Sequence, residues 1–166
     1  TNPWMQESSN KIIQHGEIVS FDTDMVGPYG YCADISRTFV CGNDFNNTQK
    51  ELYSMSLEQI NHNSNLIKAD MSFEEFTEKS WKLPEEYYGN RYSVMVHGIG
   101  LCDEWPSIRY PTDGGDKSGR FLKNMTITVE SYIGKVGGKE GVKLEQQYLV
   151  GENGLELMSH HPLEDI

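Results

Sequence analysis

The sequence predicts an α+β domain whose mainly antiparallel, curved sheet is flanked by helices. Two segments have the pattern of β-hairpins, one near each end of the chain, and a helical region lies between them. The chain has 166 residues, 37% of them hydrophobic, which is enough for one domain with a hydrophobic core. We therefore expect a single domain over residues 1–166.

The first predicted hairpin joins residues 17–25 to residues 31–41. The connection, Val26-Gly27-Pro28-Tyr29-Gly30, contains the glycines and proline that tight turns use. If the turn is centred on Tyr29, residue 24 pairs with residue 34. The hairpin contains three aspartates, Asp22, Asp24 and Asp34, although carboxylates are disfavoured in strands.

Helices are predicted after this hairpin. Asn46-Asn47-Thr48 can cap a helix over about residues 48–68. A second helix is expected to begin at Ser72, where Ser72 and Glu75 have capping-box spacing, and to end before Pro84.

The sequence after the helical region predicts further β-strands. Residues 91–100 are expected to form a strand that runs into a glycine-rich loop, and residues 105–123 an irregular surface excursion. Residues 125–133 (MTITVESYI) alternate as a half-buried strand does, and residues 141–150 (GVKLEQQYLV) follow as its partner. A turn between Gly137 and Gly138 would connect them.

The composition excludes some classes of partner. A formal net charge of −11 argues against nucleic acid or an anionic membrane surface, and no apolar run approaches the ~20 residues of a membrane span. Three cysteines without zinc-type spacing indicate reduced structural thiols, so we expect a cytoplasmic location. A small or metal-bound partner remains compatible with this charge.

The acidic residues form two predicted cross-strand pairs. A turn at Tyr29 places Asp24 opposite Asp34, and the second hairpin places Glu130 opposite Glu145, each with Cβ atoms about 4.5–5.5 Å apart. Asp22 shares a strand face with Asp24 because it lies two residues away. Like charges in such pairs are destabilising unless a cation compensates, so the pattern predicts two bridged divalent metals. The alternative is that some of these acids lie on the solvent face.

One histidine has the context of a metal ligand. His97 ends a predicted strand and precedes Gly98-Ile99-Gly100, which leaves room for a site. A lone histidine is more often structural, but one imidazole with several carboxylates suits manganese, iron or zinc. The other histidines are expected at the surface; they are His15, His62, His160 and His161.

Several stretches resemble the pita-bread metallopeptidase superfamily, which includes creatinase, prolidase and methionine aminopeptidase. They are FDTDMVGPYGYCADISRTF, MVHGIG, DEWP, VESYIG and GVKLEQQYLVGENGLELMS. The resemblance implies the pita-bread fold and a pair of metals held by Asp34, His97, Glu130 and Glu145, with Asp22 or Asp24. It also implies that the chain is the C-terminal part of the catalytic domain, that an N-terminal part and a preceding domain are absent, and that the full-length protein is a homodimer.

The departures from the peptidase pattern are informative. The chain has Asp22-Thr23-Asp24 where peptidases have D-x-G, and Asp103 where their His-Glu-x-Pro motif supplies a second histidine. It also has Lys143 where arginine is common and Ser131 where proline usually follows the glutamate. A carboxylate at position 103 cannot donate a hydrogen bond to an oxyanion, although it can accept a proton, so Asp103 argues against peptide hydrolysis.

Asp22-Thr23-Asp24, together with Asp103 in the position of the second histidine, resembles the DddP-type dimethylsulfoniopropionate (DMSP) lyases, which release dimethyl sulfide and acrylate. That resemblance implies six metal-binding residues, Asp22, Asp24, Asp34, His97, Glu130 and Glu145, and iron as the metal, with zinc or manganese as alternatives. It implies Asp103 as the general base of a β-elimination. Two divalent ions against five carboxylates leave one negative charge, which would suit a sulfonium.

Two aromatic residues are candidates for binding that sulfonium, because cations are attracted to aromatic faces. Tyr92 precedes His97 by five residues and Trp105 lies beside the base. Both could instead be core or rim aromatics. At the level of function, the alternatives are an Xaa-Pro peptidase that tolerates the altered loop and a metal-free binding module on the same scaffold.

Overall fold

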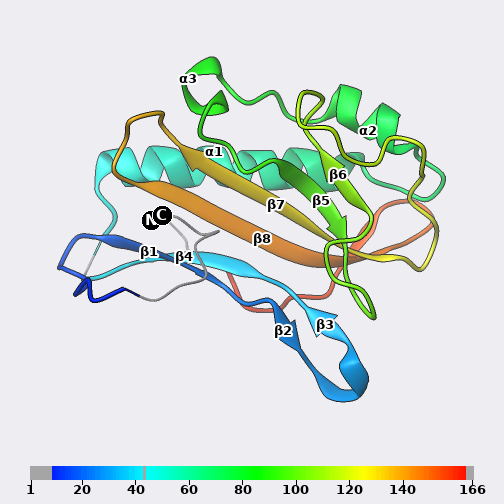
Figure 1. The fold of residues 1–166 in the computed structure, drawn as a ribbon, viewed down its shortest axis with the longest axis horizontal. Coiled ribbons are helices and arrows are strands. Elements are labelled where there is room, and N and C mark those ends of the chain that lie inside the picture. Colours follow the sequence, from blue (N-terminus) through cyan, green and yellow to red (C-terminus); the bar gives the residue numbers. More distant parts are fainter. Residues whose placement is uncertain (1–8, 43, 164–166) are drawn as a thin grey trace.

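The structure is a computed structural model that describes residues 9–42 and 44–163. Its largest sheet is fully antiparallel, with the strand order β6-β5-β7-β8-β9 (Figure 1). The strands are β5 (Val94–Gly98), β6 (Ser107–Arg109), β7 (Thr126–Gly134), β8 (Gly141–Val150) and β9 (Leu155–Leu157). The predicted second hairpin is confirmed by β7 and β8, which pair Thr126 with Leu149 through Gly134 with Gly141.

The first hairpin is also confirmed, but its ladder is interrupted. It consists of β1 (Ile18–Asp22) paired with β4 (Ser36–Val40), then β2 (Met25–Val26) paired with β3 (Cys32–Ala33). Both ladders have the register that a turn centred on Tyr29 requires, and Tyr29 lies in a short 3-10 helix, η1 (Pro28–Gly30). The interruption falls on residues 23–24 and 34–35, where Asp24 has a positive φ of 31°.

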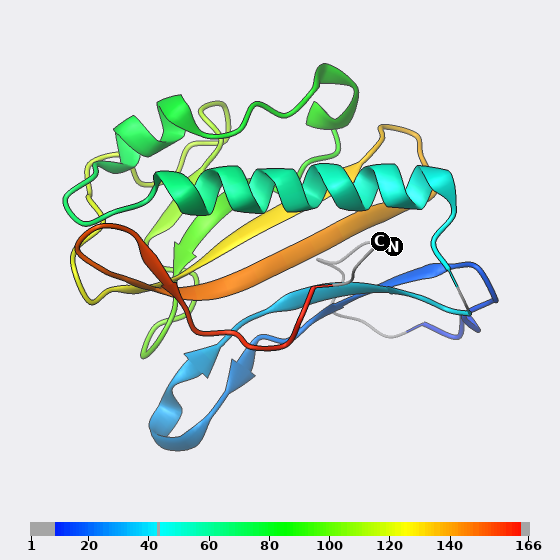
Figure 2. The same cartoon turned by 180° about the vertical axis from the view of Figure 1, so that it is seen from behind.

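Helix α1 (Asn47–Leu66) matches the predicted first helix and covers one face of the large sheet, while the hairpin lies on the other face (Figures 1 and 2). Asn46 and Gln49 form a reciprocal capping box that satisfies free N–H groups at the first turn. Helix α2 (Phe73–Lys79) begins as predicted, with Ser72 accepting a hydrogen bond from the Glu75 N–H.

Three short elements were not predicted. They are α3 (Glu85–Tyr88), β6 and β9. Each has only three or four residues, too few for a periodic pattern. The strands β6 and β9 form by pairing with β5 and β8. Ile108 of β6, for example, is fully buried although it lies in the segment predicted as an irregular excursion.

Alternate residues of β8 face the hydrophobic core on one side and the polar site on the other. Val142 and Leu144 belong to the core, which also contains Ile60 of α1, whereas Lys143 and Glu145 contact the hairpin side. A strand that is buried on both faces thus carries apolar residues toward α1 and ionisable residues toward the hairpin. No helix in the described ranges is long and apolar enough to span a membrane.

Candidate metal centre

The predicted carboxylate pairs come together between the hairpin and the large sheet. Glu130 and Glu145 are direct partners in the β7–β8 ladder, as predicted. Asp24 and Asp34 are not the ladder partners that were predicted, because the ladder is interrupted at both residues. They still meet there, since the backbone N–H of Asp24 donates to Asp34 Oδ1 at 3.3 Å. Asp34, Glu130 and Glu145 are buried, which excludes the solvent-face alternative for them; Asp22 is partly buried and Asp24 is exposed.

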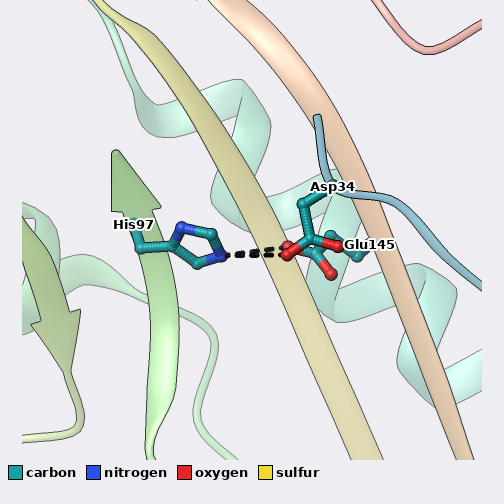
Figure 3. A group of neighbouring side chains, drawn as sticks. All are labelled: Asp34, His97 and Glu145. Carbon is teal, nitrogen blue, oxygen red and sulfur yellow. Dashed lines mark hydrogen bonds and ion pairs between the residues drawn. The ribbon is translucent and has the colours of Figure 1, made fainter. Parts of the chain in front are cut away.

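His97 points from β5 into this carboxylate group (Figure 3). Its Nε2 lies 3.2 Å from Glu145 Oε1, 3.7 Å from Asp34 Oδ2 and 3.7 Å from Glu130 Oε1. Its Nδ1 lies 3.0 Å from the carbonyl oxygen of Gly98, which orients the ring with Nε2 toward the acids. The four other histidines are exposed, as predicted.

The ligand atoms form two overlapping groups that could each hold an ion. Asp34, His97 and Glu145 form one group, and Asp22, Asp24 and Asp34 form the other, with the ligand atoms of each group within 4.8 Å of one another. Asp34 belongs to both groups, as a bridging carboxylate between two metals would. The arrangement therefore offers two adjacent cation positions rather than one.

A buried carboxylate oxygen without a hydrogen-bond partner also indicates that these side chains suit divalent metals. Glu130 Oε1 is buried and has no hydrogen-bond partner among the described residues, although a buried carboxylate oxygen without a partner is costly. This oxygen lies 3.7 Å from His97 Nε2, the nitrogen that Glu145 Oε1 also approaches, at 3.2 Å. Carboxylates with one imidazole suit manganese, iron or zinc and do not distinguish among them.

Lys143 also belongs to the site, a role that the sequence analysis missed. Its Nζ lies 2.6 Å from Glu130 Oε2, 3.1 Å from Glu145 Oε2 and 3.5 Å from Asp22 Oδ2, and the residue is 2% exposed. The available signal was its position two residues before Glu145 on the same strand face. The charge count must be corrected accordingly: five carboxylates, one lysine and two divalent ions sum to zero. The predicted residual negative charge, which would suit a sulfonium, is therefore cancelled by Lys143.

Burial and mutual repulsion shift the ionisation of the acids. Burial, with the charges of Glu145, Asp22 and Asp24, raises the pKa of Asp34 to about 9. Burial raises the pKa of Glu130 to about 7 despite the opposing charge of Lys143. Burial would also raise the pKa of Glu145, but Lys143 and the hydrogen bond from His97 outweigh it and lower this pKa.

The two cationic residues are shifted upward. Burial by itself would lower the pKa of His97, but the hydrogen bond with Glu145 and the charge of Glu130 raise it to about 10. The pKa of Lys143 is raised well above its ordinary value, because Glu130, Glu145 and Asp22 outweigh the opposing effect of burial. Without metals, the site thus retains protons that a divalent ion would displace.

The loop that carries Asp103 is held against the hairpin. The backbone N–H of Cys32 in β3 donates to the carbonyl oxygen of Gly100 at 2.7 Å. Asp103 is partly buried, and its charge, after burial and Asp22, contributes to raising the pKa of Asp24. The hydrogen bond to Gly100 therefore holds this loop beside the hairpin, where the charge of Asp103 acts on the Asp24 carboxyl.

The two predicted substrate-binding aromatics differ in exposure. Tyr92 is partly buried, its ring centroid lies 5.2 Å from Lys143 Nζ, and its hydroxyl donates to Glu104 Oε1 at 3.4 Å. Trp105 is 64% exposed. Lys143 thus already lies near the Tyr92 ring, whereas Trp105 offers an open aromatic surface beside Asp103.

The chain is similar to known proteins over nearly its whole length. The model of metallopeptidase family M24 matches residues 1–152. Two curated relatives are the dimethylsulfoniopropionate lyases DddP of Roseovarius nubinhibens, 39% identical, and Roseobacter denitrificans, 36% identical. Each match includes 99% of this chain and 37% of the relative, so the chain spans little more than a third of their length.

Two of the solved structures that this chain resembles are proline-specific peptidases. The Xaa-Pro dipeptidase of Bacillus anthracis is 32% identical with a TM-score of 0.75, and the match covers 94% of this chain and 42% of that one. The prolidase of Pyrococcus horikoshii is 26% identical with a TM-score of 0.77, covering 96% and 44%. The fold of this chain is thus part of the fold of these larger enzymes.

Proposed function

Because this chain belongs to metallopeptidase family M24 and has the pita-bread fold, we propose that it is the C-terminal part of a metal-dependent DMSP lyase. The enzyme would cleave DMSP to dimethyl sulfide and acrylate. The observation that carries the proposal is the position of Asp103, in a loop bonded to the hairpin, where a peptidase of this family would have a histidine. The match to two DddP lyases supports it.

Six residues would hold two divalent ions: Asp22, Asp24, Asp34, His97, Glu130 and Glu145. When bound, the metals would act as Lewis acids toward the substrate carboxylate and make its α proton more acidic. The family resemblance favours iron, with zinc or manganese as alternatives.

Asp103 would remove that proton as a general base. The electron pair of the C–H bond would form the double bond of acrylate, and the β C–S bond would break with its pair leaving on sulfur as neutral dimethyl sulfide. The exposed face of Trp105 would hold the sulfonium, with Tyr92 lining the opposite side near Lys143. The full-length protein is proposed to be a cytoplasmic homodimer, and the rest of its chain to complete the substrate pocket.

The test is headspace detection of dimethyl sulfide from the full-length protein supplied with DMSP. We expect dimethyl sulfide and an equal amount of acrylate, lost with a chelator and restored by added divalent metal. Hydrolysis of a proline dipeptide without dimethyl sulfide would instead select the peptidase alternative, which the similarity to the Bacillus anthracis Xaa-Pro dipeptidase keeps open. Metal analysis that finds no bound transition metal would select the metal-free binding module.

A further inference from the structure

The carboxylates of the centre each present two oxygens, and these oxygens are divided between two sides. On one side, Glu130 Oε1, Glu145 Oε1 and Asp34 Oδ2 face His97 Nε2. On the other side, Glu130 Oε2, Glu145 Oε2 and Asp22 Oδ2 face Lys143 Nζ. In each glutamate, one carboxylate oxygen therefore lies on the side of the metal positions, while the other is paired with the ammonium group of Lys143.

The surroundings of Lys143 hold its ammonium group in place. Thr38 fixes the backbone of Lys143 through two hydrogen bonds. The Thr38 hydroxyl donates to the Lys143 carbonyl oxygen at 2.8 Å, and the Lys143 N–H donates to the Thr38 hydroxyl oxygen at 3.1 Å. The ring of Tyr92 lies over Nζ. An ammonium has three donors, and the three carboxylates around it come from three strands, β1, β7 and β8.

The charge of this side chain matters most when no metal is bound. Of the lysines and arginines in the described part of the chain, Lys143 alone forms an ion pair with these carboxylates. Removing one partner of a buried ion pair leaves uncompensated charges in a low-dielectric interior, which is strongly destabilising. Divalent ions could supply the missing positive charge, but only after they have bound.

We propose that Lys143 is a permanent internal counterion that keeps the carboxylate site assembled before metals enter and orients both glutamates toward the metals. This role is independent of the substrate, so it does not rest on the proposed lyase activity. Lys143 is a positioning residue and contacts no reacting atom in this account. When no metal is bound, the ammonium group supplies part of the positive charge that two divalent ions would otherwise provide.

The test compares thermal unfolding of the full-length protein in chelator and in added Mn²⁺. We expect Lys143→Met to lower the melting temperature of the metal-free protein by about 10 °C, from the cost of unpairing a buried charge. Mn²⁺ should recover most of this loss, so the metal-induced rise should be larger than in the wild type. Lys143→Arg, which keeps the charge, should stay close to the wild type in both conditions.

Leu144→Ala is the matched control, because it removes an adjacent buried side chain on the opposite face of β8. It should lower the melting temperature equally with and without metal. An equal loss in Lys143→Met under both conditions would show an ordinary packing role and overturn the proposal. If Lys143→Met does not fold without metal, Glu130→Gln/Lys143→Met should restore folding by removing one unpaired charge. Failure of that double variant, with Lys143→Arg folding normally, would also overturn it.

Discussion

At the scale of single residues, the site contains carboxylates with different environments. Asp34 is buried among other acids and joins both ligand groups, whereas Asp103 lies in a surface loop and belongs to neither. A metal-bridging carboxylate has both oxygens committed, so it is a poor base. Asp103 lies outside both groups, so the proposed roles of metal ligand and of general base fall on different carboxylates.

Asp103→Asn tests that separation. An amide cannot accept the α proton, so dimethyl sulfide release should fall by about a hundredfold or more, which is the usual contribution of a general base. Metal content, measured by elemental analysis, should stay at the wild-type level because Asp103 is not a ligand in this arrangement. A loss of less than tenfold would exclude the role of base, and a loss of metal would assign Asp103 to the centre instead.

At the scale of secondary-structure elements, the centre depends on how the loop after β5 packs. A Cβ atom at Gly98 would lie 2.1 Å from the carbonyl oxygen of Trp105, closer than any real contact. The N–H of Gly98 also donates to the carbonyl oxygen of Pro106 at 2.9 Å. The absence of a side chain at this position therefore allows the loop carrying Asp103 to fold back against β5.

Gly98→Ala should displace this loop. Because the clash is with a backbone atom rather than a flexible side chain, we expect dimethyl sulfide release to fall at least tenfold and the melting temperature to drop. The control is Gly154→Ala, where a Cβ would meet nothing within 4 Å, and which should retain both properties. Normal activity in Gly98→Ala would show that the position of the loop is not required.

At the scale of the whole molecule, stability without metals should depend on pH through the site. Asp34 has a pKa of about 9 in the folded chain against an ordinary value of 3.8, so folding loses stability as pH rises between these values. His97, raised from 6.5 to about 10, contributes stability below pH 6.5 that is lost as pH rises through 10. Glu145 has a lowered pKa, so its contribution to stability is lost only as pH falls into the acid range.

The metal-free protein should therefore become less stable from pH 6.5 to pH 9. Metal binding should become tighter over the same range, because Asp34 and His97 must release protons to bind a divalent ion. Thermal unfolding with chelator and with Mn²⁺ should show a metal-induced rise in melting temperature that is larger at pH 8.5 than at pH 6.5. Titration calorimetry in two buffers should detect the released protons. A rise that is independent of pH would contradict these protonation states.

The sequence by itself determined the fold class, the turn at Tyr29, the register that pairs Glu130 with Glu145, and the histidine that joins them. These features depend on local rules, since strands alternate with a period of two and a turn residue sets the pairing. The interruption of the hairpin and the strands β6 and β9 were outside those rules because they depend on packing between distant segments.

Only the tertiary structure decided that the ammonium group of Lys143 lies within the carboxylate site. Lys143 appeared in the sequence as a departure from a motif, and its contacts with Asp22 and Glu130 required the hairpin to pack on β8. The division of carboxylate oxygens between Lys143 and His97 likewise depends on three dimensions. Local sequence patterns set which face a side chain occupies, but the partners of a buried charge are set by the elements that close over it.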